Sequence, residues 1–303
     1  MLIDTVGTYL AVRRAVGFQL KIVERYLRSY ADFATDRGDQ YVTGKTAIEW
    51  AALGRSANQR ANRLRVLIRF AHFARAEDTN HEVPPDHVFC RHRQRRTPYI
   101  CTDDEIKRLL LHAARLGPPG TLRGDTYQTL FGLLAATGLR ISEALSLRLQ
   151  DITPEGLVIR ETKFRKTRLV WIHESVAVAL QQYLRHRQPF ARTDHVFVSS
   201  RGGGCLGYAI VAQTFQDICK AADIHGSGVG PRPRLHDLRH RFAVKALESC
   251  PDTRDRVTRH MLALSTYMGH AHFESTYWYL DSTPQLMTDI AAACESFVQG
   301  ATP

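Results

Sequence analysis

A break in the hydrophobic pattern at residues 83–99 is the feature that most constrains how this chain can fold. The segment contains three prolines and four arginines, and it follows neither the 3.6-residue period of a helix nor the two-residue period of a strand. A chain of 303 residues is long enough for about two domains. We therefore predict that residues 1–82 and 100–303 fold as separate domains, joined by a basic linker at 83–99.

The first domain is predicted to be helical. One amphipathic helix is indicated by apolar residues at three- and four-residue steps, namely Val23, Tyr26, Leu27, Tyr30 and Phe33. A second helix follows Ser56, with one apolar side made by Leu64, Leu67, Ile68 and Ala71. The arginines of this second helix lie off its apolar side, so the helix can pack inward and present positive charge outward.

Patterns in the second domain predict helices and one small antiparallel sheet. Thr102-Asp-Asp-Glu105 combines a capping residue with acids in the first turn, which is typical of a helix start. A mostly apolar helical stretch at 130–147 is interrupted at Thr137-Gly138. Between 157 and 172, β-branched residues flank a basic segment on both sides, which predicts a β-hairpin. With mainly helical sequence after Ser175, the predicted fold class is mainly α, of α+β type in the second domain.

The charge of the chain favours a polyanionic partner. Lysine and arginine outnumber aspartate and glutamate by 41 to 30, which leaves a formal net charge of +11. Residues 54–75 hold six arginines and no acid, and residues 91–96 hold four more. A solvated basic face is one interpretation, but two nearly pure arginine blocks beside one linker favour nucleic acid. The candidate DNA-binding residues here are Arg60, Arg63, Arg69, Arg91, Arg93, Arg95 and Arg96.

Composition argues against several other classes. The six cysteines are scattered without a CxxC pair, which favours reduced thiols over a disulfide framework or a zinc site. No run of about 18 apolar residues occurs, so we expect no membrane partner and a cytoplasmic, nucleoid-associated protein. His236 and His240 have a metal-like spacing. The first histidine lacks the adjacent glutamate of zinc hydrolases, and Arg239 would repel a dication, so a zinc hydrolase is a distant alternative.

Five short motifs occur in a set order along the second domain: Ala136-Thr-Gly-Leu-Arg-Ile-Ser-Glu-Ala-Leu145, Thr162-Lys-Phe-Arg-Lys-Thr-Arg-Leu-Val170, His236-Asp-Leu-Arg-His240, Met268-Gly-His270 and Tyr279. Each motif is weakly specific alone. In this order, with Tyr279 nine residues past His270, they resemble the motifs of the tyrosine recombinases, the phage integrase family. The resemblance covers roughly residues 100–285 and extends to the first domain only through helical character and basicity.

The resemblance implies a role for each matched residue. The family's catalytic positions fall on Arg140, Lys163, His236, Arg239, His270 and Tyr279, with Glu143 as a supporting acid. Lys163 is preferred to Lys166 because relatives place the catalytic lysine first in the basic hairpin. Tyr279 is preferred to Tyr277 by its distance from His270. The hairpin reaches DNA in relatives, so Arg165 and Lys166 join the candidate DNA-binding residues.

The implied activity is site-specific cutting and rejoining of duplex DNA, in integration, excision or transposition of a mobile element. Two guanidiniums bind the phosphate oxygens, and Tyr279 forms a 3′-phosphotyrosyl link, without ATP, metal or other cofactor. The two domains are expected to form a C-shaped clamp on an inverted-repeat site. Assembly as a homotetramer is implied, with or without a second recombinase. A type IB topoisomerase and a catalytically inactive DNA-binding regulator are the alternatives.

Overall fold

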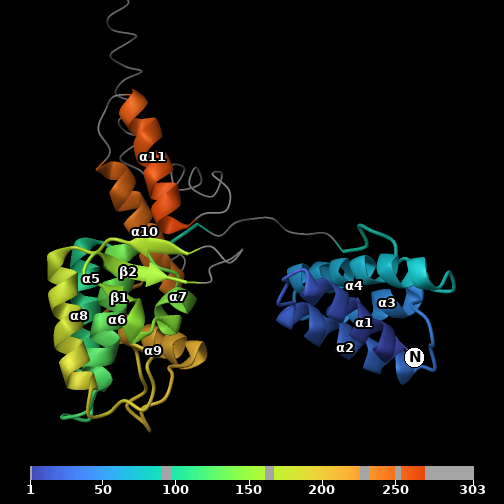
Figure 1. Ribbon diagram of the computed structural model, residues 1–303, viewed down its shortest axis with the longest axis horizontal. Coiled ribbons are helices and arrows are strands. Elements are labelled where there is room, and N and C mark those ends of the chain that lie inside the picture. The colour runs from blue at the N-terminus through green and yellow to red at the C-terminus, as the bar shows by residue number, and fades with distance from the viewer. Residues whose placement is uncertain (1, 90–96, 161–166, 226–231, 250–253, 270–303) are drawn as a thin grey trace, which may run out of the picture. The chain divides into compact units, whose positions relative to one another are not determined.

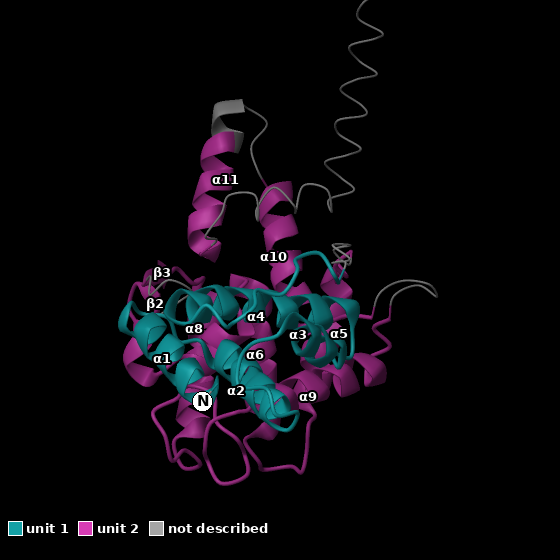
Figure 2. Ribbon diagram, turned by 90° about the vertical axis from the view of Figure 1, so that its right-hand side faces the viewer, with its two compact units in different colours: residues 1–95 teal, residues 96–303 magenta. Residues whose placement is uncertain are grey.

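The computed structural model describes residues 2–89, 97–160, 167–225, 232–249 and 254–269. The chain divides into two compact units, Met1–Arg95 and Arg96–Pro303, which Figure 2 distinguishes by colour. The division falls inside the segment 83–99. Within the described residues, no helix has the length and apolar character needed to cross a bilayer.

The described part of the first unit is helical, as predicted, and is coloured in blues in Figure 1. Its helices are α1 (Leu2–Ala15), α2 (Lys21–Thr35), α3 (Gly44–Ala52) and α4 (Ala57–Glu77). Thr43 and Ser56 start α3 and α4, because each side-chain oxygen accepts a hydrogen bond from a first-turn backbone N–H. The predicted helix after Ser56 is therefore confirmed.

Aromatic side chains fill the core of the first unit. Trp50 is 1% exposed, and the edge of its ring meets Tyr30 at a centroid distance of 5.5 Å. Leu27, Leu67 and Phe70 from α2 and α4 complete the buried centre. The apolar stripes predicted for these two helices thus face one shared core.

Packing of the first unit continues past residue 82. After α4 the chain returns to the α2–α3 connection, where the Val42 N–H donates to Nδ1 of His81 and the Gly44 N–H donates to Glu82. Val83 and Phe89 then pack against the core. The first residues of the predicted linker therefore belong to the first unit, because their apolar side chains pack against its core.

The second unit is mostly helical with a three-stranded antiparallel sheet. Its elements are α5 (Asp103–Ala114), α6 (Arg123–Thr137), α7 (Ile141–Ser146), η1 (Leu149–Asp151), β1 (Ile152–Thr153), β2 (Gly156–Ile159), β3 (Arg168–Val170), α8 (Glu174–Arg187), α9 (Tyr208–Ala221), α10 (Leu235–Glu248) and α11 (Arg254–Met268). The sheet order is β1-β2-β3, and Leu157 pairs with Val170. The predicted hairpin is confirmed as β2 and β3.

Two further sequence predictions are confirmed at helix ends. Thr102 and Glu105 form a reciprocal capping box at the start of α5. Helix α6 ends at Thr137, and Gly138 follows with a φ of 61°, in the left-handed region that favours glycine. The interruption predicted at Thr137-Gly138 is thus a turn between α6 and α7.

Helix α6 runs through the core of the second unit, with α5, α8 and α10 packed against it (Figure 1). Phe131 on α6 is fully buried and meets Phe215 of α9 edge to face, at a centroid distance of 5.4 Å. Helix α11 packs on α10 through a separate small cluster that includes Leu247, Leu264 and Met268. The Tyr267 hydroxyl of α11 donates to the carbonyl of Trp171, just after β3, which ties this helix to the sheet.

Replacing Gly138 with alanine is expected to destabilise the second unit. The left-handed conformation alone costs an L-residue about 1–2 kcal/mol. An added Cβ would also lie 2.5 Å from Cδ1 of Phe242, so the ring must shift. Gly120→Ala is the matched control, because Gly120 has a similar φ of 77° and nothing within 4 Å of the added atom. Urea unfolding should show a larger loss for Gly138→Ala, and equal losses would contradict the packing argument.

Candidate active site

The turn between α6 and α7 presents Arg140. Gly138 reverses the chain, Leu139 is buried, and Arg140 takes an extended conformation as the residue that precedes α7. Glu143 accepts a hydrogen bond from the Arg140 backbone N–H at 3.0 Å, which caps the helix. The same carboxylate accepts from Nη1 of Arg140 at 2.7 Å. The Thr-Gly-Leu-Arg-Ile-Ser-Glu sequence thus fixes both the backbone and the side chain of Arg140.

Arg239 approaches the same region from α10. Its side chain is buried, with Nη1 donating to the Gly138 carbonyl at 2.5 Å and Nη2 donating to the Met268 carbonyl at 2.8 Å. These bonds use two of the five guanidinium N–H groups. Arg239 therefore joins the α6–α7 turn to the end of α11.

Arg140 reaches that helix end as well. Its Nη2 donates to the Gly269 carbonyl at 2.9 Å, and its side chain remains 30% exposed. Gly269 ends α11 with a φ of 66°, a conformation that favours glycine. Both predicted arginines therefore hold consecutive carbonyls at the end of α11, beside the position of His270 in the sequence.

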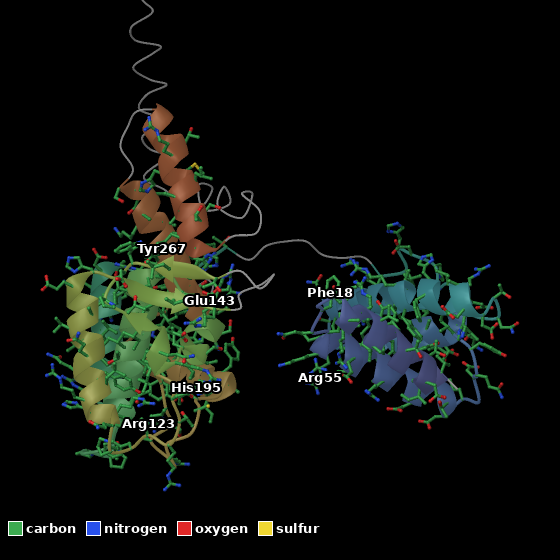
Figure 3. The ribbon with its side chains drawn as sticks, in the orientation of Figure 1. Phe18, Arg55, Arg123, Glu143, His195 and Tyr267 are labelled. Atoms are coloured by element: carbon green, nitrogen blue, oxygen red, sulfur yellow. The ribbon has the colours of Figure 1, made fainter. Side chains whose placement is uncertain are left out.

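Glu143 is buried between two arginines. Its carboxylate also accepts from Nη1 and Nη2 of Arg168, at 3.1 and 2.8 Å. Burial alone would raise the pKa of Glu143, but the hydrogen bonds and charges of Arg168 and Arg140 outweigh it and lower that pKa to about 2. The carboxylate is therefore ionised at neutral pH. Figure 3 labels Glu143 and Tyr267 in this part of the second unit.

His236 lies in the first turn of α10, three residues before Arg239, and part of its side chain is exposed. Its ring meets the ring of His240 edge to face, at a centroid distance of 4.6 Å. Desolvation by the surrounding protein and the positive charges of Arg239, Arg234 and Arg140 lower the pKa of His236 to about 4. A histidine with this pKa is neutral at pH 7.

Several predicted site residues lie outside the described residues. These are Lys163, His270 and Tyr279 of the catalytic set, and the DNA-binding candidates Arg91, Arg93, Arg95, Arg96, Arg165 and Lys166. The structure does describe Arg140, Glu143, His236 and Arg239 of the candidate site. It also shows Arg168, which sequence reasoning quoted in a motif but gave no role.

The arginines of α4 differ in their surroundings. Arg69 is exposed, and so is Arg55 just before the helix, labelled in Figure 3, whereas Arg60 is half-buried. Arg63 differs from the sequence expectation of an outward-facing residue. Its guanidinium lies over the Trp50 ring at 5.0 Å, and Nη1 donates to the Trp50 carbonyl at 3.1 Å. The long side chain folds back because an aromatic face and a carbonyl are within its reach.

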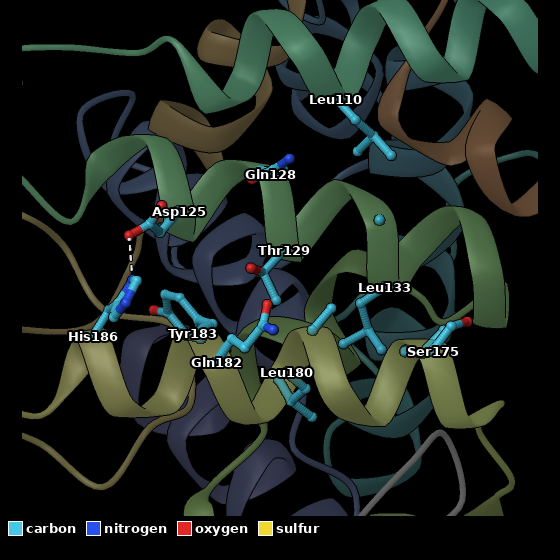
Figure 4. Close-up of a pocket in the computed structure, with 13 residues that line it drawn as sticks. Leu110, Asp125, Gln128, Thr129, Leu133, Ser175, Leu180, Gln182, Tyr183 and His186 are labelled. Atoms are coloured by element: carbon cyan, nitrogen blue, oxygen red, sulfur yellow. Dashed lines mark hydrogen bonds and ion pairs between the residues drawn. The ribbon is translucent and has the colours of Figure 1, made fainter.

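A groove lies between α6 and α8 of the second unit (Figure 4). It has a volume of about 320 Å³, with Leu110, Leu133 and Leu180 among its lining residues. At one end, Nδ1 of His186 lies 3.1 Å from Oδ2 of Asp125, within hydrogen-bond distance. None of the predicted site residues that the structure describes lines it. Among the described residues, no three histidine, cysteine or acidic side chains are grouped as metal ligands.

Comparison with known proteins identifies the family. Residues 100–285 match the phage integrase family. The chain belongs to this family. The predicted resemblance is thus confirmed, over the stretch in which the five motifs were found. Arg140, Glu143, His236 and Arg239 all lie within the matched residues of this integrase-family chain.

Individual relatives cover nearly the whole integrase-family chain. A protein of Sinorhizobium fredii named integrase/recombinase y4rB is 34% identical over 297 residues, which are 94% of each chain. Among solved structures, the XerH site-specific recombinase bound to a palindromic difH substrate has a TM-score of 0.63 at 18% identity, covering 89% of this chain and 78% of that one. A lambda integrase tetramer bound to a Holliday junction has a TM-score of 0.60 at 17% identity, covering 93% and 77%. These two structures share the fold of the integrase-family chain.

Proposed function

We propose that this chain is a site-specific DNA recombinase that cuts and rejoins strands through a 3′-phosphotyrosyl link on Tyr279, without ATP or metal. It serves the integration, excision or transposition of a mobile element, and acts on DNA in the cytoplasm, in association with the nucleoid. Family membership supports the general activity. The observation that carries the mechanism is the convergence of Arg140 and Arg239 on the end of α11.

Two arginines that converge on the end of α11 suit phosphodiester cleavage. Negative charge develops on the non-bridging oxygens of the phosphorus during attack, and fixed guanidinium donors stabilise that charge. The exposed part of Arg140 can reach a phosphate from solvent. Arg239 supplies positive charge from a buried position, where a low local dielectric strengthens its effect.

Proton transfers complete the proposed step. The Tyr279 phenol loses its proton as its oxygen attacks the phosphorus, and neutral His236 assists by accepting it. His270 hydrogen-bonds the phosphate, and Lys163 donates a proton to the departing 5′ oxygen. The products are a 3′-phosphotyrosyl strand and a free 5′-hydroxyl. Because the new link keeps the energy of the broken bond, a 5′-hydroxyl can reverse the reaction without ATP.

A nicked suicide duplex labelled at the scissile phosphate tests this proposal. The duplex carries an inverted repeat that lies beside the gene and to which the protein binds. With EDTA present and ATP absent, we expect a covalent protein–DNA adduct on a denaturing gel. Binding without any adduct would favour the regulator alternative. Relaxation of supercoiled DNA that lacks the inverted repeat would favour a type IB topoisomerase.

DNA binding should depend strongly on salt, and Arg69 should contribute to that dependence. Each phosphate neutralised on duplex DNA adds about −0.9 to the slope of log K against log[salt]. Arg69→Ala should therefore flatten the slope by about 0.9, because this exposed arginine is free to face the backbone. Arg37→Ala is the control, since Arg37 pairs with Glu49 at 3.3 Å. Fluorescence anisotropy over a salt series measures both, and an unchanged slope for Arg69→Ala would contradict the assignment.

Recombination is proposed to occur in a tetramer whose subunits clamp the two arms of each site. Residues 285–298 carry an amphipathic pattern, with Leu286, Ile290, Ala293 and Phe297 on one side. This segment lies outside the described residues. Intramolecular docking is the alternative to its donation to a neighbouring subunit.

Truncation before Leu286 distinguishes these two possibilities for the terminal segment. The shortened protein should bind a single site normally but lose recombination, because subunit coupling is removed. Gel shifts and a two-site plasmid assay measure the two activities. Normal recombination by the shortened protein would rule out the donated segment.

A further inference from the structure

Arg168 connects three parts of the second unit. It begins β3, where its backbone pairs with Ile159 of β2. Its Nε donates to the Tyr267 carbonyl of α11 at 2.9 Å, while Nη1 and Nη2 donate to Glu143 of α7. The side chain is 12% exposed. One half-buried guanidinium thus joins the hairpin, α7 and α11.

The Arg168 guanidinium also shapes the end of α11. A Cβ added at Gly269 would lie 2.8 Å from Nη1 and 2.9 Å from Cζ of Arg168. A side chain at this position would therefore force the guanidinium to shift. The Gly269 carbonyl, in turn, accepts the hydrogen bond from Arg140. Arg168 therefore hydrogen-bonds to Glu143 and occupies the space beside Gly269, and these are the two residues whose oxygens accept from Arg140.

Charge explains why a second arginine is needed here. Glu143 alone would form a neutral pair with Arg140 and reduce the attraction of that guanidinium for a phosphate. Arg168 binds the carboxylate with two parallel N–H···O bonds, the strongest geometry for this pair. The three side chains together carry a net charge of +1, with Arg140 the more exposed of the two cations.

We propose that Arg168 is a positioning residue that acts through Glu143 and Gly269 to hold Arg140 in place and keep its positive charge available to the scissile phosphate. This inference rests on the proposed function, in which Arg140 binds that phosphate. Arg168 itself lies behind Glu143 and does not touch DNA in this scheme.

The variant Arg168→Lys tests the role of the guanidinium fork. Lysine keeps the charge but cannot span Glu143 and the Tyr267 carbonyl with fixed planar geometry. We expect single-turnover cleavage of the suicide duplex to fall by about 10–100-fold, the scale of loss known for residues that orient metal ligands from behind. Arg160→Lys is the matched control, because Arg160 directly follows β2 of the same hairpin and its exposed side chain pairs with Asp151 at 2.6 Å. Circular dichroism and DNA affinity check that both variants are folded.

A neutral substrate separates positioning of Arg140 from a general structural role. In a methylphosphonate, a methyl group replaces one non-bridging oxygen, so less negative charge needs stabilisation at the phosphorus. The cleavage defect of Arg168→Lys should shrink on this substrate, as should that of Arg140→Ala. A defect of equal size on both substrates would overturn the inference, as would an Arg168→Lys variant that cleaves like Arg160→Lys.

The two proposals fail in different ways. Absence of an adduct with the wild-type protein would refute the proposed function itself. A wild-type adduct together with methylphosphonate rescue of Arg140→Ala, but not of Arg168→Lys, would refute only the role of Arg168.

Discussion

Replacing Tyr279 with phenylalanine is expected to abolish the covalent adduct while leaving DNA affinity nearly intact. The change removes the one oxygen that attacks the phosphorus and keeps the ring, so packing is preserved. The arginines that bind the phosphate are untouched. A nicked suicide duplex labelled at the scissile phosphate, followed by a denaturing gel and peptide mapping, measures the adduct and locates it.

Tyr277 is the matched control for this variant. Two residues apart on a helix, the two side chains would point about 200° apart, so only one can face the phosphate. Tyr277→Phe should therefore still form the adduct, with at most a modest loss of stability if its hydroxyl is hydrogen-bonded. An adduct that persists in Tyr279→Phe but disappears in Tyr277→Phe would reassign the nucleophile.

Replacing Arg140 with alanine is expected to lower the rate of strand cleavage by about 100–1,000-fold, the cost of removing one preorganised donor to a developing oxyanion. The fold should survive, because the side chain is 30% exposed and Glu143 keeps its two bonds from Arg168. Rapid-quench cleavage under single-turnover conditions measures the effect. It should appear in the rate at saturating protein, with a smaller change in affinity.

Arg148→Ala is the control for this second variant. Arg148 is a nearby arginine at 49% exposure, with Asp194 as its partner at 2.8 Å. It lies after α7, and the hydrogen bonds given above for Glu143 and Gly269 do not involve it. Cleavage by Arg140→Ala at the rate of Arg148→Ala would show that Arg140 does not stabilise the reacting phosphate.

Local sequence patterns predicted the helix ends and the hairpin well, because short-range chemistry determines them. Thr102 and Glu105 satisfy each other three residues apart, and Gly138 supplies a conformation that few other residues adopt. Both signals need only neighbouring residues. The same holds for Glu143, which caps the helix that begins after Arg140.

The arginine contacts could not be predicted in the same way. Arg239 and Arg140 bind backbone carbonyls of residues 138, 268 and 269. Because every residue has a carbonyl, the sequence does not show which of them accept these bonds. The place of Arg63 on Trp50 likewise depends on how α3 packs against α4. The role of Arg168 was hidden because a basic hairpin residue is expected to be solvated. Only the tertiary fold brings Glu143 beside it.

The last carbonyls of a helix carry a partial negative charge, equivalent to about half an electron at the helix end. At the end of α11, two guanidiniums bind the carbonyls that carry this charge. The helix terminus is therefore a built-in counterion, and undocking α11 would leave both arginines without it. Substitutions on the buried face of α11, such as those at Leu264 or Met268, can then change how firmly Arg140 and Arg239 are held, while every reacting group stays the same. Relatives that differ in activity are worth comparing at these positions.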